Sequence, residues 1–199
     1  SFSYHEREID SETMKSEKLV KLFAYLLSHY QRTVPSSELV DVLWYLDDVD
    51  NAIGALKHLI YRLRTLLKKE FGLTDFIITG KGSYSINPNY HLQIDTVIFE
   101  KYEALLKTSQ KPEYYEHLLE SYTGKYLMEI KEDHSVLSKR VYYHSLFMDK
   151  TIEYAMLLEE QKEYEKMERI ARQAIAIDNL EECIYEILIR SLYFQKQYK

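Results

Sequence analysis

The sequence predicts a mainly helical protein with two regions, one that combines helices with short strands and one that is purely helical. Apolar residues recur at helical spacing along most of the 199 residues, and hydrophobic side chains make up 46% of the chain. Only five Gly and three Pro are present, which is typical of a compact, helix-rich protein. Strand-like runs end near residue 90. The length allows two small domains, each with a core of its own.

The first region is expected to begin with a strand and two helices. Aromatic and polar residues alternate at positions 2–4, which is a weak strand signal. After a capping region at their start, residues 11–30 carry one apolar helical face. A short extended piece follows, and a second helix, capped by Ser36 or Ser37, is predicted to end near Trp44.

A third helix is expected in the stretch NAIGALKHLIYRLRTLLKK, residues 51–69. This stretch has no acidic residue and five Lys or Arg, although the net charge of the chain is −6. Its apolar residues step by three and four and are expected to be buried: Ile53, Leu56, Ile60, Leu63 and Leu67. Polar residues and one tyrosine line the neighbouring face: Lys57, His58, Tyr61, Arg62, Arg64, Thr65 and Lys68. The absence of carboxylates from one helix of an acidic protein favours contact with an anionic partner.

A β-hairpin is expected after this helix. Its strands are Phe76–Thr79 and Ser83–Ile86, and Gly80 and Gly82 between them are expected at positive φ in a tight turn. Three helices followed by a hairpin is the order of a winged helix-turn-helix, with the acid-free helix as recognition helix and the hairpin as wing. In the major groove of double-stranded DNA the basic face would lie among phosphates, where a carboxylate would be repelled.

The second region is predicted to be all helical. Asp95 is expected to cap a helix, and further helices are predicted at residues 112–122, 136–161, 163–178 and 181–197. Short turns separate the last helices, and small residues allow them to pack closely: Ala171, Ala174 and Ala176. Two antiparallel helices in about 34 residues are typical of tetratricopeptide-type repeats.

The motifs also resemble two known families in succession. In residues 1–87, "SSELVDVLW", "ALKHLIYRLRTLL" and "ITGKGSYSI" resemble the second helix, recognition helix and wing of the response-regulator type of winged helix. In residues 91–199, "HLQIDTVIFEKYEALL", "YTGKYLMEI" and "RIARQAIAIDNLEECIYEILIRSL" resemble the bacterial transcriptional activator domain. Their order is similar to that of the Streptomyces antibiotic regulatory protein class. The resemblance implies a DNA-binding domain at 1–90 and an activator domain at 91–199.

The same resemblance implies individual DNA-binding residues. Arg62 and Arg64 match the arginines that reach bases and phosphates, and Lys57 and His58 stand where base edges are read. Trp44 matches a tryptophan whose indole N–H can donate to a phosphate. Lys81 and Ser83 would lie at the tip of the wing, and Lys68 and Tyr61 complete the predicted set.

Simpler roles and two departures from the family pattern stay open. Arg64 could pair with an acidic residue of the second helix, such as Asp41, and Trp44 could be a core anchor. Ser37 and Ser85 stand where the family often has basic residues, so two phosphate contacts are missing unless a dimer doubles the interface.

These features predict a cytoplasmic DNA-binding transcriptional regulator that acts as an activator. The helical-repeat domain would serve as a homodimer interface on promoter DNA or contact a partner such as RNA polymerase. The alternative is a protein–protein interaction module whose winged helix does not bind DNA, which the overall acidic charge favours. The two functions require different surface charge. The acidic run DDVD at residues 47–50 would neutralise the basic face if it folded across that face, which would favour the interaction module.

Enzymatic, metal-binding, cofactor-binding and membrane functions are not expected. "TGKGS" lacks the upstream glycine of a phosphate-binding loop, and "HERE" lacks the second histidine of a zinc protease motif. The seven histidines show no repeated ligand spacing. The lone Cys183 cannot form an internal disulfide, fits a reducing compartment and is expected to be a buried apolar residue. No apolar run approaches the ~18 residues of a membrane span.

The two ends of the sequence suggest a fragment. The chain begins abruptly, so an upstream strand or receiver domain is expected, and it stops at "FQKQYK", where a further helix would normally follow. Apolar residues near this end are then expected to be exposed: Ile189, Leu192 and Phe194.

Overall fold

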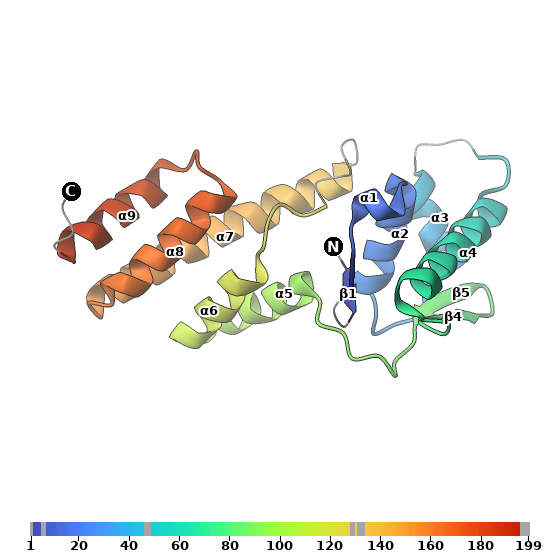
Figure 1. The fold of residues 1–199 in the computed structure, drawn as a ribbon, viewed down its shortest axis with the longest axis horizontal. Helices are drawn as coiled ribbons and strands as arrows, with labels where there is room; N and C mark the ends of the chain where they lie inside the picture. Colours follow the sequence, from blue (N-terminus) through green and yellow to red (C-terminus); the bar gives the residue numbers. More distant parts are fainter. Residues whose placement is uncertain (1, 5–6, 46–48, 128–129, 131–133, 196–199) are drawn as a thin grey trace. The chain divides into compact units, whose positions relative to one another are not determined.

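The computed structural model describes residues 2–4, 7–45, 49–127, 130 and 134–195 (Figure 1). The chain divides into two compact units, Ser1–Ile94 and Asp95–Lys199. Helices account for 65% of the described structure, and the described strands all belong to small sheets in the first unit. The predicted mainly helical class is therefore confirmed. None of the described helices combines the length and the apolar composition that a membrane crossing requires.

The first unit contains four helices and two small sheets among its described residues. Its elements are β1 (Phe2–Tyr4), β2 (Arg7–Ile9), α1 (Ser11–Met14), α2 (Glu17–Ser28), β3 (Val34–Pro35), α3 (Ser36–Trp44), α4 (Ala52–Phe71), β4 (Ile77–Gly80) and β5 (Ser83–Ile86). Strands β1 and β2 pair antiparallel, and the second sheet has the order β3-β5-β4 with antiparallel neighbours. The edge strand β4 therefore has one side that no other described strand covers.

The core of the first unit lies among α2, α3 and α4, which pack against one another. Leu22, Leu39 and Leu63, one from each helix, are fully buried. Phe2 of β1 adds an aromatic contact, because its ring meets Phe23 edge-on at 5.0 Å between centroids. The expected strand at residues 2–4 is thus present, and its ring anchors it to α2.

Helix starts differ from the prediction at two points. Lys15 has φ 51 and separates α1 from α2, so α2 has its own cap, Ser16, whose Oγ accepts from Leu19 N–H at 3.4 Å. The second helix was expected to be capped by Ser36 or Ser37, but Pro35 is its N-cap and Ser36 its first residue. The reason is the sheet: Ser36 N–H donates to the Gly82 carbonyl at 2.9 Å, which ties this helix start to the hairpin.

The apolar stripe of α4 is nearly the predicted one. Leu56, Ile60, Leu63 and Leu67 are buried as expected, but Ile53 is 46% exposed. Leu59 is buried in addition, which shifts the centre of the stripe to one side. At 3.6 residues per turn, Ile53 lies about 70° from that centre and in the first turn, so the prediction for Ile53 was wrong.

The second unit is a succession of helices that pack in chain order. The helices are α5 (Asp95–Leu106), α6 (Pro112–Ser121), α7 (His134–Glu160), α8 (Tyr164–Ile177) and α9 (Glu182–Phe194). Each contacts the next one, and α7 also contacts α9. Residues 131–133, ahead of the long helix, and Met128 and Glu129 of the expected loop lie outside the described residues.

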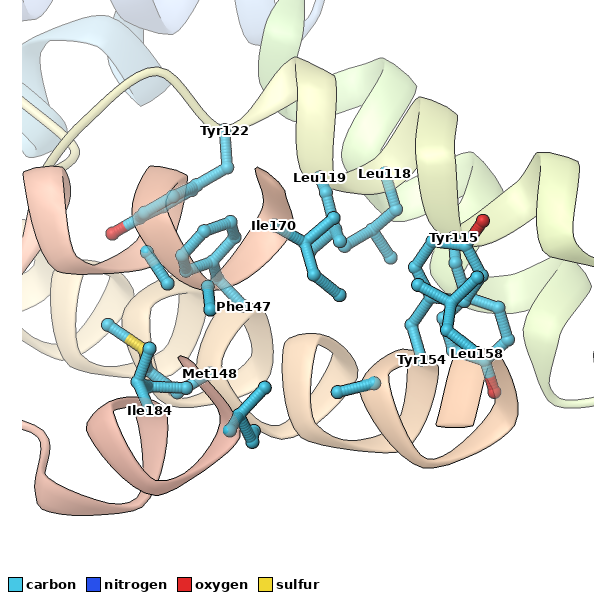
Figure 2. Packing of buried hydrophobic residues seen from close by; sticks show 14 of the residues in the cluster. Tyr115, Leu118, Leu119, Tyr122, Phe147, Met148, Tyr154, Leu158, Ile170 and Ile184 are labelled. Carbon is cyan, nitrogen blue, oxygen red and sulfur yellow. The ribbon is translucent and has the colours of Figure 1, made fainter. Parts of the chain in front are cut away.

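Aromatic rings pack among aliphatic side chains in the core of the second unit (Figure 2). Tyr122 stacks on Phe147 at 4.5 Å between centroids, and Tyr115 stacks on Tyr154 at 5.1 Å with an angle of 1° between the rings. The hydroxyl of Tyr154 donates to Glu116 Oε1 at 2.8 Å, so a buried ring keeps a satisfied polar end. Burial raises the pKa of Tyr115 to about 12.

Small residues allow α8 to pack closely, with one exception. Ala171 and Ala174 are fully buried, as predicted, but Ala176 is exposed. Ala176 lies two residues after Ala174, which is about 200° around the helix, so it cannot share the buried face. Cys183 is half-buried and packs against the core, close to its expected role.

Candidate nucleic-acid interface

Helix α4 presents the candidate site, and both of its ends are fixed by specific contacts. The Asn51 side chain caps the start by accepting from Gly54 N–H at 2.9 Å. A Cβ on Gly54 would lie 2.6 Å from Asn51 Nδ2, so the cap uses the space that glycine leaves. At the other end Gly72 has φ 73 and its N–H donates to the Lys68 carbonyl at 2.9 Å, as in an αL C-cap motif. The predicted acid-free segment is therefore one continuous helix.

The predicted reading residues lie on the open face of α4. Lys57, His58 and Lys68 are exposed, and Tyr61 is 67% exposed. Arg62 is half-buried, so its stem covers part of the helix surface while its charged end can reach solvent. This face offers cations and hydrogen-bond donors together with one large ring.

The positive charge on this face has no carboxylate partner within the described structure. In the part of the chain that the structure describes, no acidic side chain pairs with Lys57, Arg62 or Lys68. Lys69 is different, because its Nζ lies 2.8 Å from Glu70 Oε1 and this hydrogen bond raises the pKa of Lys69. The positive charge available to a partner is therefore carried by Lys57, Arg62 and Lys68 rather than by Lys69.

Arg64 occupies a different position from the other basic residues. Its Nη2 donates to the Ile77 carbonyl oxygen and to Thr79 Oγ1, both at 2.7 Å, and the side chain is half-buried. These bonds connect α4 to β4. No ion pair joins Arg64 to Asp41 among the described residues, so the pairing that the sequence allowed is not formed here. Thr79 was not predicted as a partner of Arg64, because helical periodicity does not identify contacts between residues 15 positions apart.

The predicted hairpin is present, with its tip next to an exposed lysine. Gly80 pairs with Ser83 at the end of the ladder, and Lys81 and Gly82 form the two-residue turn. Gly82 has φ 69, as expected, whereas Gly80 belongs to β4 and is not at positive φ, so that expectation was wrong. Lys81 is exposed and Ser83 is half-buried. Since the turn residue is Gly82, a single glycine suffices to reverse the chain.

Trp44 is half-buried at the end of α3, and a cation already lies over its ring. Lys18 Nζ is 5.2 Å from the ring centroid, which is within the range of a cation–π interaction. This contact agrees with an anchoring role for the ring. Of the two positions that depart from the family pattern, Ser37 is exposed and Ser85 is half-buried opposite Ile78.

The acidic groups of the first unit are only partly described. Asp47 and Asp48 of the acidic run lie outside the described residues, and Asp50 is exposed just before α4. Glu38, in the first turn of α3, is bound by Arg32 and also accepts from the Tyr25 hydroxyl at 2.6 Å. The Arg32 hydrogen bonds, and then that of Tyr25, lower the pKa of Glu38 to about 2. This carboxylate is therefore compensated within its own cluster.

The described residues of the second unit have fewer features of a ligand-binding site than the face of α4. Among the described residues no group of three His, Cys, Asp or Glu side chains could hold a metal ion. A depression of about 130 Å³ between α6 and α8 is lined by Glu116, Leu119, Glu120, Arg169, Ile170 and Gln173. It is smaller than the roughly 300–1,000 Å³ of typical ligand pockets. His144 and Lys125 both contact Asp178, with His144 Nε2 3.2 Å from Oδ2, which connects α7 to the end of α8.

No protein-family model matches this chain, and comparison with curated proteins finds no match either. A functional assignment therefore depends on the residues and their geometry. The most informative geometry is that of α4 and the β4–β5 hairpin.

Proposed function

We propose that the chain is a DNA-binding transcriptional regulator, an activator, whose first unit is a winged helix-turn-helix. In this proposal α4 is the recognition helix and the β4–β5 hairpin is the wing. The observation that carries it is the open face of α4: Lys57, Arg62 and Lys68 have no acidic partner among the described residues. An acidic protein that leaves these cations uncompensated offers a site for an external polyanion.

Recognition would combine two kinds of contact. Arg62, Lys68 and Lys81 would neutralise phosphates, which supplies affinity without sequence preference. Lys57 or His58, one turn or more ahead of Arg62 on the exposed face, would read base edges in the major groove. Ser83, Trp44 and Tyr61 would add contacts at the rim, where a hydroxyl, an indole N–H or an aromatic ring can meet the backbone or a base.

The second unit would act through proteins rather than DNA. Helices α8 and α9 pack together across a short connection, which supports the proposal of a tetratricopeptide-like repeat. Ile189 on α9 is 65% exposed and Phe194 is 45% exposed, as the sequence predicted, while Leu192 is half-buried. We assign to this unit the formation of a homodimer on promoter DNA or contact with RNA polymerase, in the cytoplasm and without a cofactor.

A second candidate function is a protein–protein interaction module whose winged helix does not bind DNA. The net charge of −6 favours it, and so do Ser37 and Ser85 at positions where the family often has basic residues. The exposed side chains of Tyr185, Ile189 and Tyr193 on α9 also suit a protein partner.

The deciding experiment measures the affinity of the purified chain for a random 30-base-pair duplex across a salt series. We expect binding with a Kd of roughly 10⁻⁶–10⁻⁴ M at physiological salt. The logarithm of the affinity should fall linearly with the logarithm of the salt concentration. Arg62→Ala should lower affinity about tenfold, equivalent to ~1.4 kcal/mol, and reduce the salt slope by about one. Lys166 is exposed on α8 of the second unit, so Lys166→Ala is the control and should change neither the affinity nor the salt slope. A wild-type chain that does not bind at low salt would overturn the proposal and favour the interaction module.

A further inference from the structure

Arg64 links α4 to the one side of the hairpin that no described strand covers. The order β3-β5-β4 makes β4 an edge strand. Asn87 N–H donates to the Phe76 carbonyl at 2.8 Å, so that carbonyl faces the β5 side. Successive carbonyls of a strand point to opposite sides, and the next one, of Ile77, therefore points away from β5. Arg64 Nη2 bonds to this outward carbonyl at 2.7 Å.

The second bond of Arg64 fixes the hairpin further toward its tip. Nη2 also donates to Thr79 Oγ1 at 2.7 Å, and Thr79 is paired with Tyr84, whose side chain is buried. Thr79 lies two residues before Lys81, the first residue of the turn, so this bond holds the strand close to the tip of the hairpin. Two hydrogen bonds from one guanidinium thus hold β4 at Ile77 and at Thr79.

We propose that Arg64 is a positioning residue rather than a residue that contacts DNA. It holds the hairpin against α4, so that Lys81 has a fixed position relative to the recognition helix. This inference rests on the proposed DNA binding and concerns how the site is built. Both N–H groups of Arg64 Nη2 already donate to protein oxygens, so the guanidinium is held at the hairpin. Leaving the Ile77 carbonyl and the Thr79 hydroxyl without this donor in order to reach DNA would cost both bonds.

Arg62 provides a matched comparison two residues away. It is also a half-buried arginine of α4, but among the described residues no hydrogen bond or ion pair of its side chain holds it to another element, unlike Arg64. Arg62 is therefore expected to act directly and independently of the hairpin, whereas Arg64 acts through Lys81. The two arginines of one motif would have different functions.

The test is a pair of double-mutant cycles in the full chain, read as affinity and salt slope on a fluorescent random 30-base-pair duplex. The first cycle combines Arg64→Ala with Lys81→Ala, and the second combines Arg62→Ala with Lys81→Ala. If Arg64 positions Lys81, Lys81→Ala should lower affinity about fivefold in the wild type and only about twofold after Arg64→Ala. The slope of log affinity against log salt should then be smaller by about one in the Arg64/Lys81 double variant, which corresponds to one lost phosphate contact. In the Arg62/Lys81 double variant it should be smaller by about two.

Additive effects in the first cycle, with a loss of about two from the slope, would overturn the inference and make Arg64 a direct contact. Thr79→Val keeps all charges and removes one acceptor, so it should weaken the effect of Lys81→Ala, and Thr79→Ser should restore it. An unchanged Lys81 effect in Thr79→Val would also count against the inference.

Amide hydrogen exchange of β4 and β5 separates this inference from the proposed function. Arg64→Ala and Thr79→Val should speed exchange in the hairpin, and Arg62→Ala should not. If the wild type fails to bind DNA, the proposed function fails whatever exchange shows. If it binds but exchange in the hairpin is unaffected by Arg64→Ala, the positioning role alone fails.

Discussion

The exposed face of α4 in the first unit and the helices of the second unit differ in how their basic residues are paired. In the second unit many are paired with carboxylates: Lys107 with Glu103, Lys125 with Asp178, Lys150 with Glu153, Lys166 with Glu163, Arg172 with Glu168 and Arg190 with Glu159. On α4 of the first unit, Lys57, Arg62 and Lys68 have no such partner among the described residues. Paired surface charges are a common feature of any solvated helix and contribute little energy. Unpaired ones on a single face are the better sign of a site.

The largest expected effect tests whether the units are independent of each other. Phe147→Ala removes a ring that is 1% exposed from the second unit, and Leu63→Ala removes a fully buried side chain from α4. The first should destabilise its unit by ~3–5 kcal/mol and the second by ~2–5 kcal/mol, as measured by amide exchange in urea. Only Leu63→Ala should also weaken binding to the random duplex. A loss of DNA affinity in Phe147→Ala would show that the second unit contributes to the site.

Charge reversal addresses the comparison directly. The double variant Arg62→Glu with Lys68→Glu should lower duplex affinity about 100-fold at low salt, because it removes two phosphate contacts and adds repulsion. The matched variant Lys107→Glu with Arg172→Glu makes the same change of charge in the second unit, where it separates two ion pairs. It should leave affinity within about twofold of the wild type. Equal losses in the two variants would mean that net charge, and not the α4 face, determines binding.

The smallest expected effect concerns acid stability. Hydrogen bonds from Arg32 and Tyr25 lower the pKa of Glu38 from 4.5 to about 2. The contribution of ionised Glu38 to the free energy of unfolding is therefore present above about pH 4.5 and is lost as pH falls toward 2. The difference in stability between wild type and Glu38→Gln should shrink across that window. Because the Glu38 side chain is 30% exposed, the difference at neutral pH should stay below ~1 kcal/mol.

Glu168→Gln is the counterpart in the second unit, where Arg172 and then Gln195 lower the pKa of Glu168. The difference in stability between wild type and Glu168→Gln should also shrink toward acid pH, but by a smaller amount, as measured by thermal unfolding at a series of pH values. A difference for Glu38→Gln that grows toward acid pH would contradict the described hydrogen bonds.

Local signals predicted the main elements well. The helix predicted at residues 51–69 is α4, Ala52–Phe71, because its apolar residues step by three and four along the segment. The hairpin follows from the glycine-containing turn between two apolar runs. In both cases the determining residues lie within a few positions of the element that they fix.

Contacts between distant residues were not predictable in this way. The strand β2 has only one apolar residue, Ile9, and forms because it pairs with β1. Ile53 fits the helical period but lies at the margin of the stripe that the neighbouring helices cover. For Arg64, the sequence supplied a basic residue on a basic helix, and only its bonds to β4 show that it is already engaged. Periodicity identifies a face, but it does not identify what that face touches.

The length of α4 sets the scale of any duplex that it could read. Twenty residues at ~1.5 Å each give a rod of ~30 Å, which equals about nine base pairs at ~3.4 Å per step. Lys57 and Lys68, eleven residues apart, are separated by ~16 Å along the axis, or about five base pairs. The two lysines would therefore contact different phosphates of the DNA backbone, and a duplex much shorter than about five base pairs could not contact both at once.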